Sequence, residues 1–75
     1  MHTQPTSPPH KFLRLPAVEA LTGYRRSKIY KMEFEGTFVK RIKLGPRTTI
    51  WIAEEVAQWM AERVAEARIA PEVIQ

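Results

Sequence analysis

The strongest hydrophobic pattern of the chain lies in its last third, between residues 54 and 69. Apolar side chains recur there at three- and four-residue steps, a spacing that places them on one face of a helix. The members of this stripe are Val56, Trp59, Met60, Val64 and Ala67. Glu54 and Glu55 fall in the first turn and Arg68 in the last, which complements the helix dipole. The pattern predicts a long, acidic amphipathic helix that serves as a scaffold, with its tryptophan in the core.

Two shorter helical patterns precede this helix. Pro16 suits the first turn of a helix, because its missing N–H would have no helical partner there. Glycine is the usual residue just after a helix ends. The first helix is therefore expected at residues 16–22, with Val18 and Leu21 facing inward and Gly23 as its stop.

The second of these helices is expected at residues 27–35, with Ile29 and Met32 facing inward and Gly36 ending it. Two short helices joined by a glycine-containing turn are typical of a helix-turn-helix, whose second helix usually enters the major groove of DNA. The same spacing also occurs in ordinary helical hairpins. The outer face of the second helix comprises Arg26, Ser27, Lys28, Tyr30 and Lys31.

Residues 38–52 show the pattern of a β-hairpin. Apolar residues at 38, 42 and 44 and basic residues at 41 and 43 approach the two-residue alternation of a half-buried strand. Gly45-Pro46 indicates a turn, and the β-branched and aromatic residues 48–52 fit the returning strand, with Trp51 in the core. The basic residues either prevent an exposed sheet edge from pairing with another chain or form a DNA-contacting wing. The adjacent basic helix favours the wing. Residues 12–15 are compatible with a further short strand.

The charge of the chain is concentrated in its middle third. Residues 25–47 hold eight basic and two acidic residues, a net charge of +6, whereas residues 48–75 carry a net charge of −3. Clustered basic charge is the expected footprint of a polyanionic partner. A solvated surface face is the simpler alternative, and composition alone does not separate the two.

Length and composition exclude several classes of protein. Seventy-five residues make one small domain, expected at residues 11–70, between a disordered proline-rich leader at 1–10 and a flexible tail at 71–75. The chain has no cysteine, and its histidines, His2 and His10, lie in the leader, so no metal or other cofactor is expected. The sequence shows no recognisable set of catalytic residues, so an enzyme is not expected. No apolar run suggests a membrane segment or signal peptide, so a cytoplasmic protein is expected.

An ordered set of short motifs runs from Phe12 to about Arg63. These motifs are Arg14-Leu15-Pro16, Leu21-Thr22-Gly23, Arg26-Ser27, Ile29-Tyr30-Lys31, Glu35-Gly36, Phe38, Lys40, Lys43-Leu44-Gly45-Pro46-Arg47, Trp51 and the pair Val56 and Trp59. The set, with its spacings, resembles the AlpA family of phage-type transcriptional regulators. The resemblance implies an α+β winged helix-turn-helix related to the MerR group and to phage excisionases. It also implies a role in transcription of prophage or genomic-island genes, or in site-specific excision.

The resemblance and the basic pattern together define the expected DNA-contacting residues. The major-groove set is Arg25, Arg26, Ser27, Lys28, Tyr30 and Lys31, and the wing set is Lys40, Arg41, Lys43, Arg47 and Thr48. The expected partner is double-stranded DNA, with an integrase or further copies of the chain as additional partners. A protein-binding inhibitor or adaptor of another regulator is the alternative.

Three positions depart from the family pattern, and one of them is Glu54, which replaces the usual serine at the start of the third helix and is a weak cap. Arg25 stands where the family commonly has a serine, so a helix-capping hydroxyl is lost and a phosphate-seeking charge is gained. Glu33 stands where an apolar residue is usual. The end of the second helix is therefore expected to be rotated or frayed.

Overall fold

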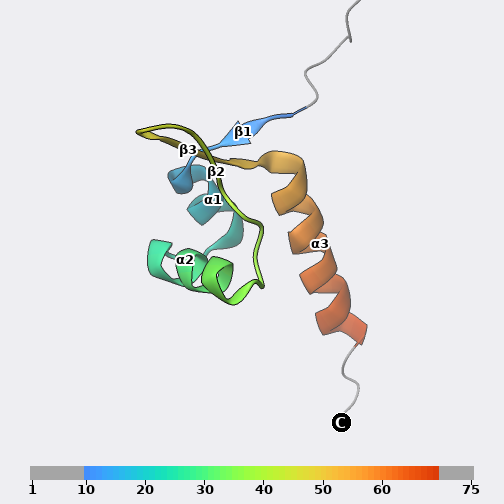
Figure 1. Cartoon of the computed structure of the whole chain (residues 1–75). Coiled ribbons are helices and arrows are strands. Elements are labelled where there is room, and N and C mark those ends of the chain that lie inside the picture. The colour runs from blue at the N-terminus through green and yellow to red at the C-terminus, as the bar shows by residue number, and fades with distance from the viewer. Residues whose placement is uncertain (1–9, 70–75) are drawn as a thin grey trace, which may run out of the picture.

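The computed structural model describes residues 10–69, which form an α+β fold (Figure 1). The elements in chain order are β1 (Phe12–Leu13), α1 (Leu15–Thr22), α2 (Arg26–Glu35), β2 (Ile42–Gly45), β3 (Thr48–Ile52) and α3 (Ala53–Ile69). The predicted fold, with two short helices, a hairpin and a C-terminal helix, is confirmed. Apart from His10, the predicted leader at 1–10 and the tail at 71–75 lie outside the described residues.

A small sheet joins the segment before α1 to the segment before α3. Its strand order is β1-β3-β2, and both pairings are antiparallel. β1 places Leu13 opposite Trp51 on the central strand β3. The β2–β3 hairpin has an irregular register between Lys43 and Gly45, next to its turn. Such a bulge increases the local twist of a hairpin and so changes the direction of its tip.

The first strand of the hairpin is shorter than the alternation predicted. A strand at residues 38–44 was expected, but β2 begins only at Ile42, so the first half of that prediction is wrong. The reason is that residues 38–41 make contacts other than strand pairing. Phe38 is buried in the core, and the backbone N–H of Arg41 donates to the Glu33 carboxylate at 2.8 Å.

Both short helices end at a glycine in the left-handed conformation. Gly23 has φ of 80° and Gly36 has φ of 79°, values that glycine adopts without steric cost. At the end of α2, the N–H groups of Gly36 and Thr37 donate to the carbonyl oxygens of Glu33 and Met32, respectively, as in a Schellman motif. The last turn of α2 is therefore closed, and the expectation of a rotated or frayed helix end is wrong.

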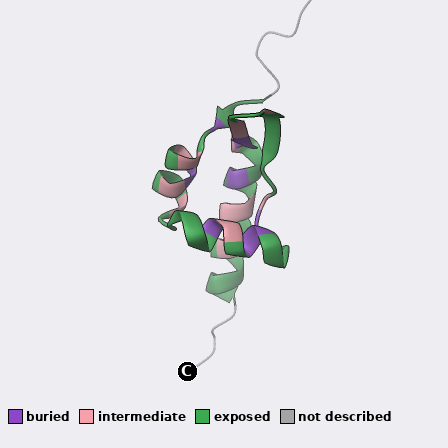
Figure 2. Cartoon of the chain, turned by 60° about the vertical axis from the view of Figure 1, so that its left-hand side comes forward, coloured by how far each residue is buried: buried purple, intermediate pink, exposed green. Residues whose placement is uncertain are grey.

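The core takes one fully buried side chain from each of the four main elements. Val18 of α1, Ile29 of α2, Trp51 of β3 and Val56 of α3 are all 0% exposed. Figure 2 shows the buried residues, in purple, in the middle of the molecule. The inward orientation predicted for these four residues is confirmed.

Several apolar residues predicted to be buried are exposed instead. Leu21 is 51% exposed and Val64 is 46% exposed, and Ala67 is also exposed. On the hairpin, Ile42 and Leu44 are 39% and 52% exposed. The 17 residues of α3 span about 25 Å, so its second half runs past the small core (Figure 2). No helix within residues 10–69 has the length and apolar character needed to cross a bilayer.

Candidate nucleic-acid interface

The predicted DNA-contacting residues lie on α2, on the turn before it and along residues 40–48. The exposed members are Arg25, Arg26, Ser27, Lys28, Lys31, Lys40, Arg41, Lys43 and Arg47, while Tyr30 and Thr48 are partly buried. In Figure 1, α2 and the hairpin tip lie on the left of the molecule and the acidic α3 on the right. The fold thus separates the basic segment from the four glutamates of α3.

A cleft of about 680 Å³ lies between α2 and β2. The predicted residues that the structure brings together here are Tyr30, Lys40, Arg41 and Lys43. Phe34 and Thr49, which were not predicted as site residues, also line this cleft. Three basic side chains around an open cleft create a positive potential suited to a phosphate backbone.

Glu33 organises the inner wall of this cleft, and sequence reasoning missed this role. It is only 8% exposed, and both oxygens of its carboxylate are used. Oε2 accepts from the indole N–H of Trp51 at 3.0 Å and from the backbone N–H of Arg41 at 2.8 Å, and Oε1 accepts from the Arg41 guanidinium at 2.9 Å. The carboxylate therefore ties α2 to β3 and to the segment that leads into the hairpin.

Arg41 has a structural task in addition to its predicted contact with DNA. Its guanidinium pairs with Glu33 and lies 4.6 Å from the centre of the Tyr30 ring. Tyr30 in turn stacks on Trp51, with ring centres 6.5 Å apart. The Arg41 side chain remains 44% exposed, so one face of this stack is open to the cleft.

The start of α2 forms a second part of the candidate surface. Arg25 precedes the first turn in an extended conformation and provides no side-chain cap, as expected from the missing serine. The first N–H groups of a helix lack intrahelical partners and give its N-terminus a partial positive charge. Arg25, Arg26 and Ser27 surround this end and line a hollow against α1. This end of α2 therefore combines fixed and side-chain positive charge.

The hairpin tip forms the third part. Arg47 is exposed in the two-residue turn after β2, and the Lys43 ammonium donates to the carbonyl of Pro46 at 3.5 Å. The guanidinium of Arg14 donates to the carbonyl of Arg47 at 3.4 Å. Arg14 was not predicted as a site residue, because it lies 33 positions from Arg47 in the chain. The β1–β3 pairing brings its basic side chain to the tip.

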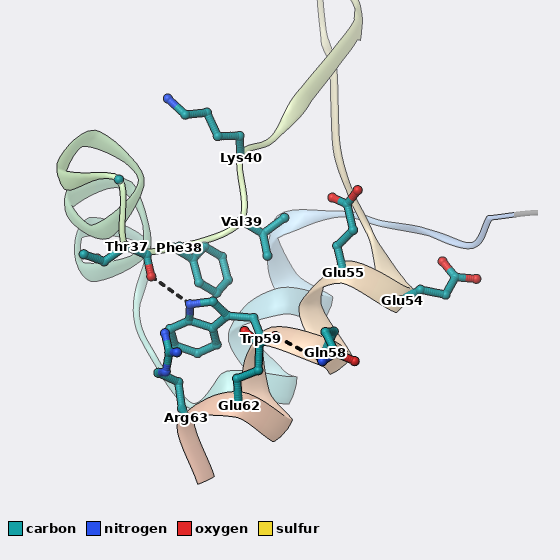
Figure 3. Close-up of a pocket in the computed structure, with 11 residues that line it drawn as sticks. Thr37, Phe38, Val39, Lys40, Glu54, Glu55, Gln58, Trp59, Glu62 and Arg63 are labelled. Carbon is teal, nitrogen blue, oxygen red and sulfur yellow. Dashed lines mark hydrogen bonds between the residues drawn. The ribbon is translucent and has the colours of Figure 1, made fainter. Parts of the chain in front are cut away.

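A groove of different character separates α3 from residues 36–40 (Figure 3). Its floor is aromatic, because the ring of Phe38 meets that of Trp59 edge to face at 4.7 Å. The Trp59 indole N–H donates to the Thr37 carbonyl at 2.7 Å, which fastens α3 to the loop after α2. The carboxylates on the α3 side of the groove belong to Glu54, Glu55 and Glu62. They would repel phosphate, so this groove does not belong to the basic surface.

No group of side chains within residues 10–69 is suited to holding a metal ion. The candidate surface therefore offers cationic groups, aromatic rings and helix N–H groups. Such groups bind anions and flat rings through electrostatic attraction, hydrogen bonding and stacking.

Comparison with known proteins places this sequence in a family. Residues 11–64 match the family model described as "Prophage CP4-57 regulatory protein (AlpA)". The uncharacterized protein ORF88 of Enterobacteria phage P4 is 42% identical over 55 residues, which cover 73% of this chain and 62% of that protein. The DNA-binding transcriptional activator AlpA of Escherichia coli K12 is 36% identical over 59 residues, which cover 71% of this chain and 84% of that protein. No solved structure matches significantly. Because the family model matches well over half of the residues of the chain, the chain belongs to the AlpA family of prophage regulatory proteins.

Proposed function

We propose that the chain is a sequence-specific DNA-binding regulator of prophage or genomic-island genes. In this proposal α2 enters the major groove and the β2–β3 hairpin contacts the minor groove or the backbone beside it. The observation that supports it most is the exposure of the basic residues on α2 and the hairpin, away from the acidic α3. The name of the E. coli relative, a DNA-binding transcriptional activator, supports the same conclusion.

The regulatory outcome has two forms that share this surface. The chain either controls transcription or acts as an excisionase-type directionality factor, which bends DNA for a recombinase. Bound copies of the chain on adjacent sites, or an integrase, are the proposed protein partners. Both forms require binding to duplex DNA, so DNA binding is the first property to test.

The dependence of binding on salt tests the proposal directly. If the basic residues of the 25–47 segment neutralise about five phosphates, the logarithm of the association constant should fall against the logarithm of salt concentration with a slope of about −4 to −5. Fluorescence anisotropy with a labelled duplex of arbitrary sequence, from low to physiological salt, measures this slope. A flat dependence would contradict DNA binding as the main activity.

The two parts of the surface are expected to contribute differently. Arg26 begins α2, where recognition helices present side chains to base edges, and a bidentate arginine–guanine contact discriminates by about 1–3 kcal/mol. Arg47 lies at the hairpin tip, where backbone contact carries little sequence information. Arg26→Ala should therefore weaken specific binding more than binding to scrambled DNA. Arg47→Ala should weaken binding to specific and to scrambled DNA equally, and it should make the dependence of binding on salt less steep.

Titration of each variant on specific and scrambled duplexes distinguishes these effects. Arg68→Ala is a matched control, because it removes one exposed positive charge from α3 and should leave both affinities nearly unchanged. Equal losses for Arg26→Ala and Arg47→Ala on both duplexes would contradict the division of labour while leaving DNA binding intact.

A second candidate function, recruitment of a protein partner, is favoured by the groove beside α3. Its aromatic floor and its carboxylates would attract a Lys or Arg side chain of another protein, which would displace the groove's own Arg63 from its position 5.3 Å from the centre of the Trp59 ring. This groove contains no residue of α2, but it shares Lys40 with the proposed wing, so a partner bound there would leave α2 available to DNA and compete with DNA for that lysine.

A further inference from the structure

Phe34 is an unusual residue on the candidate DNA surface. It is 92% exposed, the highest value among the large apolar side chains in residues 10–69. It lies in the last turn of α2, whose other exposed residues are polar or charged. A single exposed apolar side chain is common on protein surfaces, so it is the position of Phe34 on a basic helix, beside a basic cleft, that marks it out.

The fold holds Phe34 in this exposed position. Its neighbour Glu33 is buried and fixed by hydrogen bonds to Trp51 and Arg41. Successive residues of a helix are about 100° apart, so a buried Glu33 turns Phe34 away from the core. The closed turn at Gly36 prevents the helix end from unwinding to hide the ring. The exposure is therefore a fixed feature of α2.

The surroundings of Phe34 are basic. It lines the cleft between α2 and β2 together with Lys40, Arg41 and Lys43. Along α2 it follows Ser27 by seven residues and Lys31 by three, a spacing that places the three side chains on one face. From Ser27 to Phe34 the helix rises about 10 Å, or about three base-pair steps of 3.4 Å. Phe34 thus adds one apolar residue to the helix face that is predicted to read the bases.

We propose that Phe34 reads thymine, by packing its ring against the C5-methyl group in the major groove. That methyl group is the one apolar feature of a base edge in this groove, and it fits an apolar side chain surrounded by phosphate-binding cations. The proposal rests on the proposed function and adds a specificity-determining residue to it. The basic surroundings favour DNA over an apolar protein surface as the contact of this ring.

Replacement of thymine by deoxyuridine, which lacks the methyl group, tests the contact. The recognised duplex is first selected from a random library with the wild-type chain and then prepared with either base. Wild type should bind the deoxyuridine duplex about fourfold more weakly for each methyl group contacted, the factor expected for one buried methyl-sized group. Phe34→Ala should bind both duplexes equally, because the partner of the methyl group is gone.

Two controls isolate the effect. Lys31→Ala should weaken binding to both duplexes while keeping the thymine preference, and Phe34→Leu should keep part of that preference. Because Phe34 is 92% exposed, its variants should have the same unfolding temperature as the wild-type chain. Comparing the two proteins on the two duplexes removes any effect of deoxyuridine on DNA shape, as in a double-mutant cycle.

The outcomes separate this inference from the function on which it rests. A wild-type chain that binds DNA but is indifferent to the methyl group would overturn the thymine contact alone. The same holds if Phe34→Ala retains the wild-type preference, or if it reduces only cooperative binding of adjacent copies. If no duplex is selected at all, the proposed function fails together with this inference.

Discussion

Replacing Trp51 with alanine is expected to remove most of the stability of the domain. Trp51 is 0% exposed, pairs with Leu13 across the sheet and stacks on Tyr30 of α2. Removing a large buried aromatic side chain costs about 3–5 kcal/mol, and the total stability of a small domain is at the lower end of about 5–15 kcal/mol. Thermal unfolding followed by circular dichroism measures the loss.

Two comparisons show which property of Trp51 matters. Trp51→Phe keeps an aromatic ring but removes the N–H that donates to Glu33, so its loss should be smaller, about 1–3 kcal/mol. Trp59→Ala should also lower the free energy of unfolding by less than Trp51→Ala, because Trp59 is only partly buried, at the edge of the core. A Trp51→Ala chain that unfolds cooperatively near the wild-type temperature would contradict the assignment of Trp51 as the central core residue.

The order and type of the elements could be predicted because they depend on local patterns. Gly23 and Gly36 end α1 and α2 where the sequence indicated, and β3 runs over Thr48–Ile52 as expected. The resemblance to the AlpA family is confirmed by the family match. That membership places the chain among prophage regulatory proteins.

The burial of individual residues was harder to predict. Periodicity identifies an apolar face but carries no information on how far the neighbouring elements extend along it. Leu21 and Val64 lie on such faces, yet both are about half exposed, at 51% and 46%. In the same way, alternation predicted a strand from residue 38, whereas Phe38 enters the core instead. These differences arise because a chain of this size has little core to cover its apolar surface.

The arrangement of the candidate site depends on contacts between residues distant in sequence. Basic residues on α2 and the hairpin were visible in the sequence, and their contacts with DNA stay a prediction. The pairing of Glu33 with Arg41 and Trp51, at separations of eight and 18 residues, could not be read from spacing. A signal was present nonetheless, since Glu33 stands on the same helix face as Ile29 and Met32, which are also buried.

Removal of the Glu33 carboxylate is expected to have the second largest effect on stability. Glu33→Ala leaves the buried Trp51 indole N–H and the Arg41 backbone N–H without their acceptor. An unsatisfied buried donor costs about 1–3 kcal/mol, so the two together should lower the free energy of unfolding by about 3 kcal/mol. Glu33→Gln should lower the free energy of unfolding by less. The amide oxygen of glutamine still accepts hydrogen bonds, although its NH₂ group faces one of the donors.

Glu35→Ala provides a matched control, because it removes the same charge from the same turn of α2. Glu35 is exposed, so its replacement should change the free energy of unfolding by less than about 0.5 kcal/mol. Urea unfolding of the three variants and the wild type measures these differences. If Glu33→Ala and Glu35→Ala are equally stable, the carboxylate does not hold α2, β3 and the hairpin together. A large difference between them would show that Glu33 fixes the basic segment against α2. The same anchor would keep Phe34 and the cleft beside it in place, so Glu33→Ala should also weaken DNA binding, despite the loss of a negative charge.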